Sequence, residues 1–303
     1  MTGATGVLGR GAVQSLVDAG HQVVASARSE QGAAWLHRLG AESRPADVFD
    51  IDSLASLFDG CDAVVNLATR IPVGYSVARP GAWHTNDRLR TRGVDNVAVA
   101  ARRAGVRRIV QESVSFVYAD HADGWITERH PIDITPATEP VAVAESQVQE
   151  YADGPRVGVV LRFGMVVGDD RATGFQLKAV RHGRPIGIGR PEAWAHVVHT
   201  DDIGPAVVAA LHAPSGVYNV GAEPVLRSDL VDGFAAAAGV APTGYLGPVL
   251  RRLAGARLEP LTRSLRVCSD HFAASTGWVP SRAAFAVDWL DSAASRMVQG
   301  SRR

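Results

Sequence analysis

The sequence predicts an α/β protein in which a doubly wound parallel sheet carries helices on both faces and a smaller, mainly helical lobe follows at the C-terminus. Two observations predict this fold: a glycine-rich turn at the start of the chain, and apolar runs of strand length that alternate with amphipathic segments through the first 220 residues. Such alternation is typical of a parallel sheet covered on both sides. We expect strands at 21–27, 62–67, 106–111, 156–163 and 216–220, and helices near 52–59, 83–104, 140–152 and 203–213.

The opening turn carries glycines at positions 3, 6 and 9, followed by a helical pattern that Gly20 ends. Gly3 allows a sharp turn, Gly6 lets the backbone approach phosphates, and Gly9 lets the next helix pack closely on the sheet. The amides of that helix N-terminus then face an anion. The segment therefore predicts a binding site for a dinucleotide pyrophosphate, although a glycine triplet alone would also fit a plain turn.

Only two residues precede Gly3, whereas a buried strand of about five residues is expected there. We therefore expect the first strand of the sheet to be truncated. We also expect the start of the chain to be misassigned, with Met1 standing where a longer natural chain has an internal valine. The N-terminal sequence of the native protein tests this expectation.

Composition excludes several classes of protein. The chain has 303 residues, with 31 basic and 31 acidic side chains, and this balance argues against a nucleic-acid-binding protein. Cys61 and Cys268 have no partner spacing, so neither a metal site nor a disulfide framework is indicated, and a reducing cytoplasm fits. There is no apolar run of about 20 residues and no signal-peptide pattern, so we expect a cytoplasmic protein without a membrane span.

The pattern along the chain divides it into two parts. Residues 1–165 are predicted to form a dinucleotide-binding domain, to which residues 197–222 return. Residues 166–196 and 223–303 are predicted to form a substrate-binding lobe, because helix patterns predominate after position 223 and Pro and Gly interrupt them at 242–248.

Several ordered segments resemble the extended short-chain dehydrogenase/reductase superfamily, in the atypical branch of its NAD-dependent epimerase/dehydratase group. The resemblance covers nearly the whole chain and implies a Rossmann-type fold, with a homodimer through the helices near 83–104 and 140–152. It rests on Thr2-Gly-Ala-Thr-Gly-Val-Leu-Gly9, Ala46-Asp-Val48, Asn66-Leu-Ala-Thr69, Leu161-Arg-Phe-Gly164, Val198-His-Thr-Asp-Asp202, Val217-Tyr-Asn-Val-Gly221 and Thr276-Gly-Trp-Val-Pro280.

The end of the second strand indicates which cofactor is bound. A carboxylate there favours NAD, and a cation favours the 2′-phosphate of NADP. The segment Ala25-Ser-Ala-Arg28-Ser29 has no acid before Glu30. Arg28 offers a guanidinium and Ser29 a hydroxyl, so NADP is favoured, with NAD as the alternative. The competing interpretation is that Arg28 only caps a surface turn.

The resemblance also implies the other cofactor contacts. The opening loop would hold the pyrophosphate, Asp47 and Val48 would border the adenine, and the residues after the fourth strand would line the path to the nicotinamide ribose. Asp47 could instead cap a turn, and Leu67 could be core. The full set is Gly3, Thr5, Gly6, Val7, Leu8, Gly9, Arg28, Ser29, Asp47, Val48, Leu67, Ala68, Thr69, Phe163 and Met165.

The catalytic pattern of the superfamily is missing. Members that move a hydride use a Tyr-x-x-x-Lys pair, in which the cation lowers the pKa of the phenol. The only lysine in the chain is Lys178, four residues after Gly174, and alignment on Glu150 puts Ala142 and Ser146 where the pair would stand. None of these arrangements supplies the pair.

Three residues near the end of the fifth strand are the catalytic candidates: Glu112, Ser113 and Tyr118. A carboxylate at the buried carboxyl end of a parallel strand should have an elevated pKa unless it is paired, which suits a general acid or base. Glu112 could instead form an ion pair with an arginine such as Arg162, and Tyr118 could be structural. Glu145 is a further candidate that could equally face solvent.

Substrate contacts are expected from Arg70, Tyr75, Trp194 and Arg266, although Trp194 could be packing. Asn86 is expected to be structural. No metal is indicated. The sequence thus favours an NADP-dependent oxidoreductase or epimerase-like enzyme for a small carbonyl, alcohol or sugar-like substrate. The alternatives are a non-catalytic NADP-binding redox sensor, and an isomerase or lyase that uses the same fold.

Overall fold

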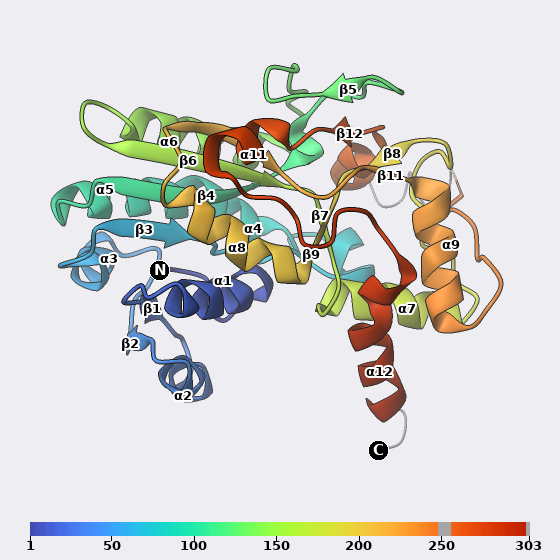
Figure 1. The fold of residues 1–303 in the computed structure, drawn as a ribbon, viewed down its shortest axis with the longest axis horizontal. Helices are drawn as coiled ribbons and strands as arrows, with labels where there is room; N and C mark the ends of the chain where they lie inside the picture. Colours follow the sequence, from blue (N-terminus) through green and yellow to red (C-terminus); the bar gives the residue numbers. More distant parts are fainter. Residues whose placement is uncertain (248–255, 301–303) are drawn as a thin grey trace.

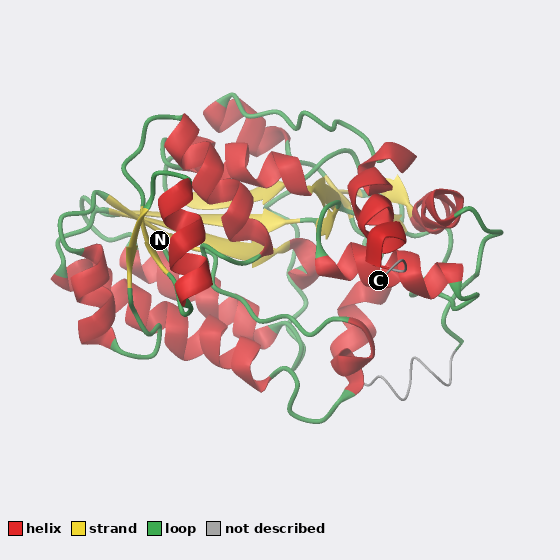
Figure 2. Ribbon diagram, turned by 90° about the horizontal axis from the view of Figure 1, so that it is seen from below, coloured by secondary structure: helices red, strands yellow, loops and turns green. Residues whose placement is uncertain are grey.

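A parallel sheet lies at the centre of the computed structural model, which describes residues 1–247 and 256–300 (Figures 1 and 2). Four strands are paired in the order β10-β6-β4-β3, and every pair is parallel. The strands are β3 (Ala63–Asn66), β4 (Arg108–Val114), β6 (Val157–Phe163) and β10 (Gly216–Val220). All four were predicted from the sequence, and together they confirm the expected α/β class.

Two residues at the start of the chain connect this sheet to a second strand pair. Strands β1 (Val24–Ser26) and β2 (Glu42–Arg44) are parallel. The Ser26 amide donates to the Met1 carbonyl at 3.0 Å, and the Thr2 amide donates to the Val65 carbonyl at 3.0 Å. Met1 and Thr2 therefore occupy the central position of the sheet, between β1 and β3.

Helices cover both faces of the sheet, as Figure 2 shows. One core contains apolar residues of α1 (Val7–Asp18) and α8 (Thr200–Ala210) with Val110 of β4. The other contains those of α3 (Ile51–Phe58), α5 (Val94–Arg103) and α6 (Glu139–Tyr151) with Ile109. Because neighbouring residues of a strand point to opposite faces, the two cores lie on opposite sides of the sheet. The helix α2 (Glu30–Arg38) follows β1.

The expected helix over 83–104 is interrupted. It consists of α4 (His84–Arg88), a π-helical turn (Leu89–Gly93) and α5. Arg90 lies in the π-helical turn with only 3% of its surface exposed, and its guanidinium pairs with Glu112 on β4. Turns of this kind occur frequently at functional sites. The segment has only one apolar side chain, Leu89, and its buried residues are Arg90 and Gly93, so hydrophobic periodicity did not locate the interruption.

Most of the remaining elements gather beyond the carboxyl ends of the sheet strands, whereas α11 (Asp270–Thr276) packs against β10. Helices α7 (Arg171–Arg181), α9 (Arg227–Ala238) and α12 (Asp291–Gly300) lie together at the right of Figure 1. The short strands are β5 (Trp125–Ile126), β7 (Met165–Val167), β8 (Trp194–Ala195), β9 (Val197–His199), β11 (Val225–Leu226) and β12 (Arg266–Val267), and α11 follows β12.

The division into a cofactor domain and a substrate lobe stays a prediction. Residues 248–255 and 301–303 of the expected lobe lie outside the described residues. Among the helices that the structure describes, none is both long enough and apolar enough to cross a membrane.

Candidate active site

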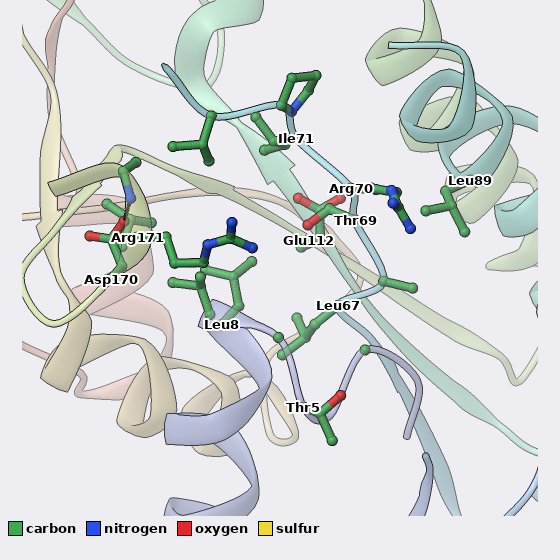
Figure 3. Close-up of a pocket in the computed structure, with 18 of the residues that line it drawn as sticks. Thr5, Leu8, Leu67, Thr69, Arg70, Ile71, Leu89, Glu112, Asp170 and Arg171 are labelled. Atoms are coloured by element: carbon green, nitrogen blue, oxygen red, sulfur yellow. Dashed lines mark hydrogen bonds between the residues drawn. The ribbon is translucent and has the colours of Figure 1, made fainter. Parts of the chain in front are cut away.

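A large cleft opens along the carboxyl ends of the sheet strands and encloses about 2230 Å³. Its walls come from the opening loop, from the segments after β3, β4 and β6, and from α7 (Figure 3). Ligands of open α/β sheets bind at this edge. The structure places the following predicted cofactor residues on the cleft wall: Gly3, Thr5, Gly6, Val7, Leu8, Arg28, Asp47, Val48, Leu67, Ala68, Thr69, Phe163 and Met165.

The shape of the opening loop explains two of its glycines. Gly3 has a φ of +71°, and a Cβ on it would lie 2.4 Å from the Leu67 carbonyl carbon, so no other residue fits without a shift. A Cβ on Gly9 would lie 2.1 Å from the Gly3 carbonyl oxygen. Gly9 therefore lets α1 pack against its own loop. That loop directly follows Thr2 in the sheet, so these contacts do not contradict the expected close packing of the helix on the sheet. Gly9 itself does not line the cleft.

Arg28 and Ser29 have different positions after β1. Arg28 is exposed and lines the cleft. The Ser29 hydroxyl caps α2 by accepting a hydrogen bond from the Gly32 amide at 3.2 Å, and Ser29 is absent from the cleft wall. Of the two, only Arg28 remains a candidate for the adenosine end of a cofactor. Asp47 both lines the cleft and accepts a turn hydrogen bond from the Phe49 amide at 2.9 Å.

Glu112 lies at the end of β4 on the cleft wall and is 1% exposed (Figure 3). Its Oε2 accepts from Nη2 of Arg90 at 3.0 Å. Burial raises the pKa of Glu112, and the charge and hydrogen bond of Arg90 oppose this only in part. The expected ion pair therefore exists, but its partner is Arg90 and not Arg162. Within the described part of the chain, Oε1 of Glu112 has no hydrogen-bond partner.

Beside Glu112, a second buried cluster is centred on Glu145. The Ser113 hydroxyl donates to Oε1 of Glu145 at 2.5 Å, and Arg162 donates to both carboxylate oxygens, at 2.9 and 2.6 Å. Ser113 and Arg162 are register partners on β4 and β6, so their side chains share a face of the sheet. Glu145 is 4% exposed, which excludes the solvent-facing alternative. Ser113 lines the cleft, and its hydroxyl is oriented by a carboxylate.

The structure does not bring four predicted site residues to the cleft wall. The Tyr118 hydroxyl is buried and donates to Asn219 at 2.7 Å, and burial raises the pKa of Tyr118 to about 12, against the effect of Arg162. Tyr75 accepts a hydrogen bond from Arg184. Arg266 stacks on Trp194, 4.5 Å from the ring centroid. These contacts are structural, so we correct the expectation that Tyr118, Tyr75, Trp194 and Arg266 meet a substrate in this cleft.

Arg70 does line the cleft, and its backbone is fixed by Asn86, whose side-chain oxygen accepts from the Arg70 amide at 3.1 Å. This agrees with a structural role for Asn86. The sequence interpretation missed Arg90 and the cations of α7. Arg90 carried no signal, whereas the spacing of Arg171, Lys178 and Arg181 was visible. Within residues 1–247 and 256–300, no group of three or more His, Cys, Asp or Glu side chains could hold a metal ion.

The fold and the cleft together define a dinucleotide-binding protein of the Rossmann type. The sequence profile of the NAD dependent epimerase/dehydratase family matches residues 1–221, and the chain belongs to this family. Its relatives are NAD(P)-dependent reductases and epimerases of the extended short-chain dehydrogenase/reductase type. The resemblance stated from the sequence is thus confirmed.

Two curated relatives match over most of their length. The chain is 28% identical over 298 residues to a 3-diazoavenalumate denitrifying reductase from Streptomyces sp, covering 93% of this chain and 95% of the relative. It is 28% identical over 310 residues to a 2-alkyl-3-oxoalkanoate reductase from Stenotrophomonas maltophilia, covering 90% and 89%.

Solved structures show the same fold. A UDP-glucose 4-epimerase with UDP-glucose from Thermotoga maritima has a TM-score of 0.79 at 18% identity, covering 100% of this chain and 98% of that one. MoeE5 in complex with UDP-glucose and NAD has a TM-score of 0.76 at 22% identity, with 100% and 98% covered. At these identities the likeness supports the fold and no particular substrate.

Proposed function

We propose that the protein is an NADP(H)-dependent oxidoreductase that reduces a small carbonyl-type substrate. The observation that carries the proposal is that the glycine loop, Arg28 and the buried Glu112 all open onto one cleft. The loop fits a dinucleotide, because side chains at Gly3 and Gly9 would collide with the backbone that shapes the cradle. When bound, the cofactor supplies the hydride. The names of both full-length relatives are those of reductases that act on organic carboxylates.

The residues of the chain would divide the remaining tasks. Backbone amides of the opening loop would bind the pyrophosphate. Arg28 would pair with the 2′-phosphate. Glu112, whose pKa is raised by burial, would keep its proton at higher pH than an ordinary glutamate and deliver it to the substrate oxygen. Ser113, one residue further along β4 and held by Glu145 on the other face of the strand, would contact the substrate apart from the oxygen that Glu112 protonates.

Arg28→Ala tests the cofactor preference. We expect NADPH binding to weaken roughly ten- to a hundredfold and NADH binding to stay nearly unchanged, because a charged hydrogen bond to the 2′-phosphate contributes about 1.5–3 kcal/mol. Fluorescence titration of both cofactors measures this. Arg38→Ala is the matched control, since it removes an exposed arginine of α2 that does not line the cleft. Equal losses for NADPH and NADH would remove the argument for NADP.

Glu112→Gln tests the proton donor. We expect kcat to fall about a hundredfold with NADPH affinity retained, the lower range for loss of a general acid. In the wild-type enzyme, turnover should fall as the pH rises through the raised pKa of Glu112, and this step should vanish in the variant. Absorbance at 340 nm with a carbonyl panel measures turnover, and the melting temperature is followed because Arg90 loses its carboxylate. If the pH step were the same in Glu112→Gln as in the wild type, Glu112 would be excluded as the proton donor. Binding that distinguishes NADPH from NADP⁺ without any turnover would favour the alternative of a non-catalytic redox sensor.

Reductive loss of nitrogen from a diazo substrate is a second candidate function. It is the activity in the name of the Streptomyces relative. The observation that favours it is that no tyrosine lines the cleft within the described residues. Hydride addition to a diazonium carbon forms a C–H bond, and the C–N electron pair leaves with N2, so no oxygen needs a proton. Turnover of an arenediazonium salt that survives Glu112→Gln would favour this candidate.

A further inference from the structure

One face of α7 presents cations to the cleft. Arg171, Gly174, Lys178 and Arg181 follow each other at intervals of three, four and three residues, which places them along one side of the helix. All four line the cleft. Gly174, in the middle of this face, has no side chain, and a Cβ on it would meet nothing within 4 Å. The space beside this face, between Arg171 and Lys178, is therefore open.

The segment after β3 supplies two more cations to the same cleft, Arg70 and Arg79. In Figure 3 Arg171 and Arg70 lie on opposite sides of Glu112, with Arg70 beside Leu89. In the part of the chain that the structure describes, none of the five cationic side chains has a hydrogen-bond or ion-pair partner. The five are Arg70, Arg79, Arg171, Lys178 and Arg181.

Three acidic side chains on this part of the cleft wall are already engaged, and a fourth, Asp201, lies 3.4 Å from His199. Asp169 pairs with Arg296. Asp170 caps α7 by accepting from the Ala172 amide at 2.6 Å and the Thr173 amide at 3.2 Å. Glu112 pairs with Arg90 at 3.0 Å. The five cations therefore give this end of the cleft an excess of positive charge that the neighbouring acids leave uncompensated.

The position of Arg171 is unfavourable for the helix itself. It is the first residue of α7, and a cation at a helix N-terminus opposes the helix dipole. Lys178 and Arg181 lie in the last turn, where the same dipole favours cations, so helix stability explains them in part. It does not explain Arg171. Its place on the cleft wall points to a ligand with the opposite charge.

We propose that this cationic face binds the carboxylate of a substrate with an apolar body, an inference that rests on the proposed function. A carboxylate can accept two parallel hydrogen bonds from a guanidinium, which suits Arg171. Apolar side chains of the cleft wall would hold the body of the substrate and exclude a polar sugar. They are Ile71, Val73, Val114, Phe116, Met165 and Val166.

Calorimetric titration with probe pairs that differ only in charge tests this proposal. Cinnamate and octanoate, with their amides, are titrated into the free protein and into the protein saturated with NADP⁺. We expect at least one carboxylate to bind, its amide not to bind, and Arg171→Gln/Lys178→Gln to weaken the carboxylate at least tenfold. Arg107→Gln is the control, because this exposed arginine precedes β4 at the opposite end of the strand from Glu112.

Each other outcome decides against the proposal. It is overturned if no carboxylate binds, if acid and amide bind alike, or if the double variant binds the acid as the wild type does. UDP-glucose serves as a further probe: if it alone binds and the double variant loses it, the cations belong to a diphosphate. Binding of NADP⁺ is measured separately, so carboxylate binding without NADP⁺ binding would refute the proposed function, whereas NADP⁺ binding without carboxylate binding would refute only this inference.

Discussion

Gly9→Ala should abolish NADPH binding at working concentrations and destabilise the protein by about 3 kcal/mol, the upper range for an overpacked buried site. The new methyl group would lie 2.1 Å from the Gly3 carbonyl oxygen and 2.6 Å from that of Ala4. Both contacts are with backbone, so a rotamer change cannot relieve them and the loop itself must move. If two hydrogen bonds from backbone amides to the phosphates are lost, at about 1.5–3 kcal/mol each, the affinity for NADPH falls at least a hundredfold.

Gly11→Ala is the matched control for this experiment. It adds the same methyl group to the same helix, but its nearest neighbour would be the Thr200 carbonyl oxygen at 3.6 Å, an ordinary contact. We expect the free energy of unfolding to stay the same or to rise by up to about 1 kcal/mol from helix propensity. Gly11 also lines the cleft, but its Cβ would be clear of the loop backbone, so NADPH affinity should fall far less than in Gly9→Ala. Thermal unfolding followed by circular dichroism and NADPH fluorescence measures both variants. If Gly9→Ala behaved like Gly11→Ala, the loop would not be the cofactor cradle.

The fold was predictable because its signals are local. Each strand of the main sheet overlaps an apolar run in the sequence, and the turn that precedes α1 requires glycine at positions that the sequence shows directly. The interruption of the helix at Leu89–Gly93 was not predictable. Arg90 of this turn pairs with Glu112, and these two residues come from different elements whose approach only the assembled sheet determines.

The site was predictable in position but not in pairing. Strand ends and loops identified most of the cleft wall, because the carboxyl ends of parallel strands meet at one edge. The sequence offered Arg162 as the partner of Glu112, since both lie on neighbouring strands. Register decides otherwise: Arg162 is opposite Ser113, one residue further along β4, and so points to the other face of the sheet from Glu112. A shift of one residue in the pairing of β4 with β6 would turn each side chain to the opposite face of the sheet, and the sequence alone does not specify the register to one residue.

Arg162→Met should destabilise the protein by about 3–5 kcal/mol, the usual result when one partner of a buried ion pair is removed. Burial alone would lower the pKa of Arg162, but its hydrogen bonds to Glu145 and the charge of that carboxylate outweigh burial, and the net pKa is raised. Methionine fills much of the same volume but donates no hydrogen bond. The Glu145 carboxylate would then stay buried with only the Ser113 hydroxyl as a donor among the contacts described.

The double variant Arg162→Met/Glu145→Leu separates the cost of an unpaired charge from the cost of lost packing. Because it removes both charges, we expect its free energy of unfolding to return to within about 1–2 kcal/mol of the wild type. Arg44→Met breaks the exposed pair with Glu42 and should change stability by less than about 1 kcal/mol. Urea unfolding measures all three. A double variant as unstable as Arg162→Met would mean that packing around Arg162 matters more than the unpaired charge of Glu145.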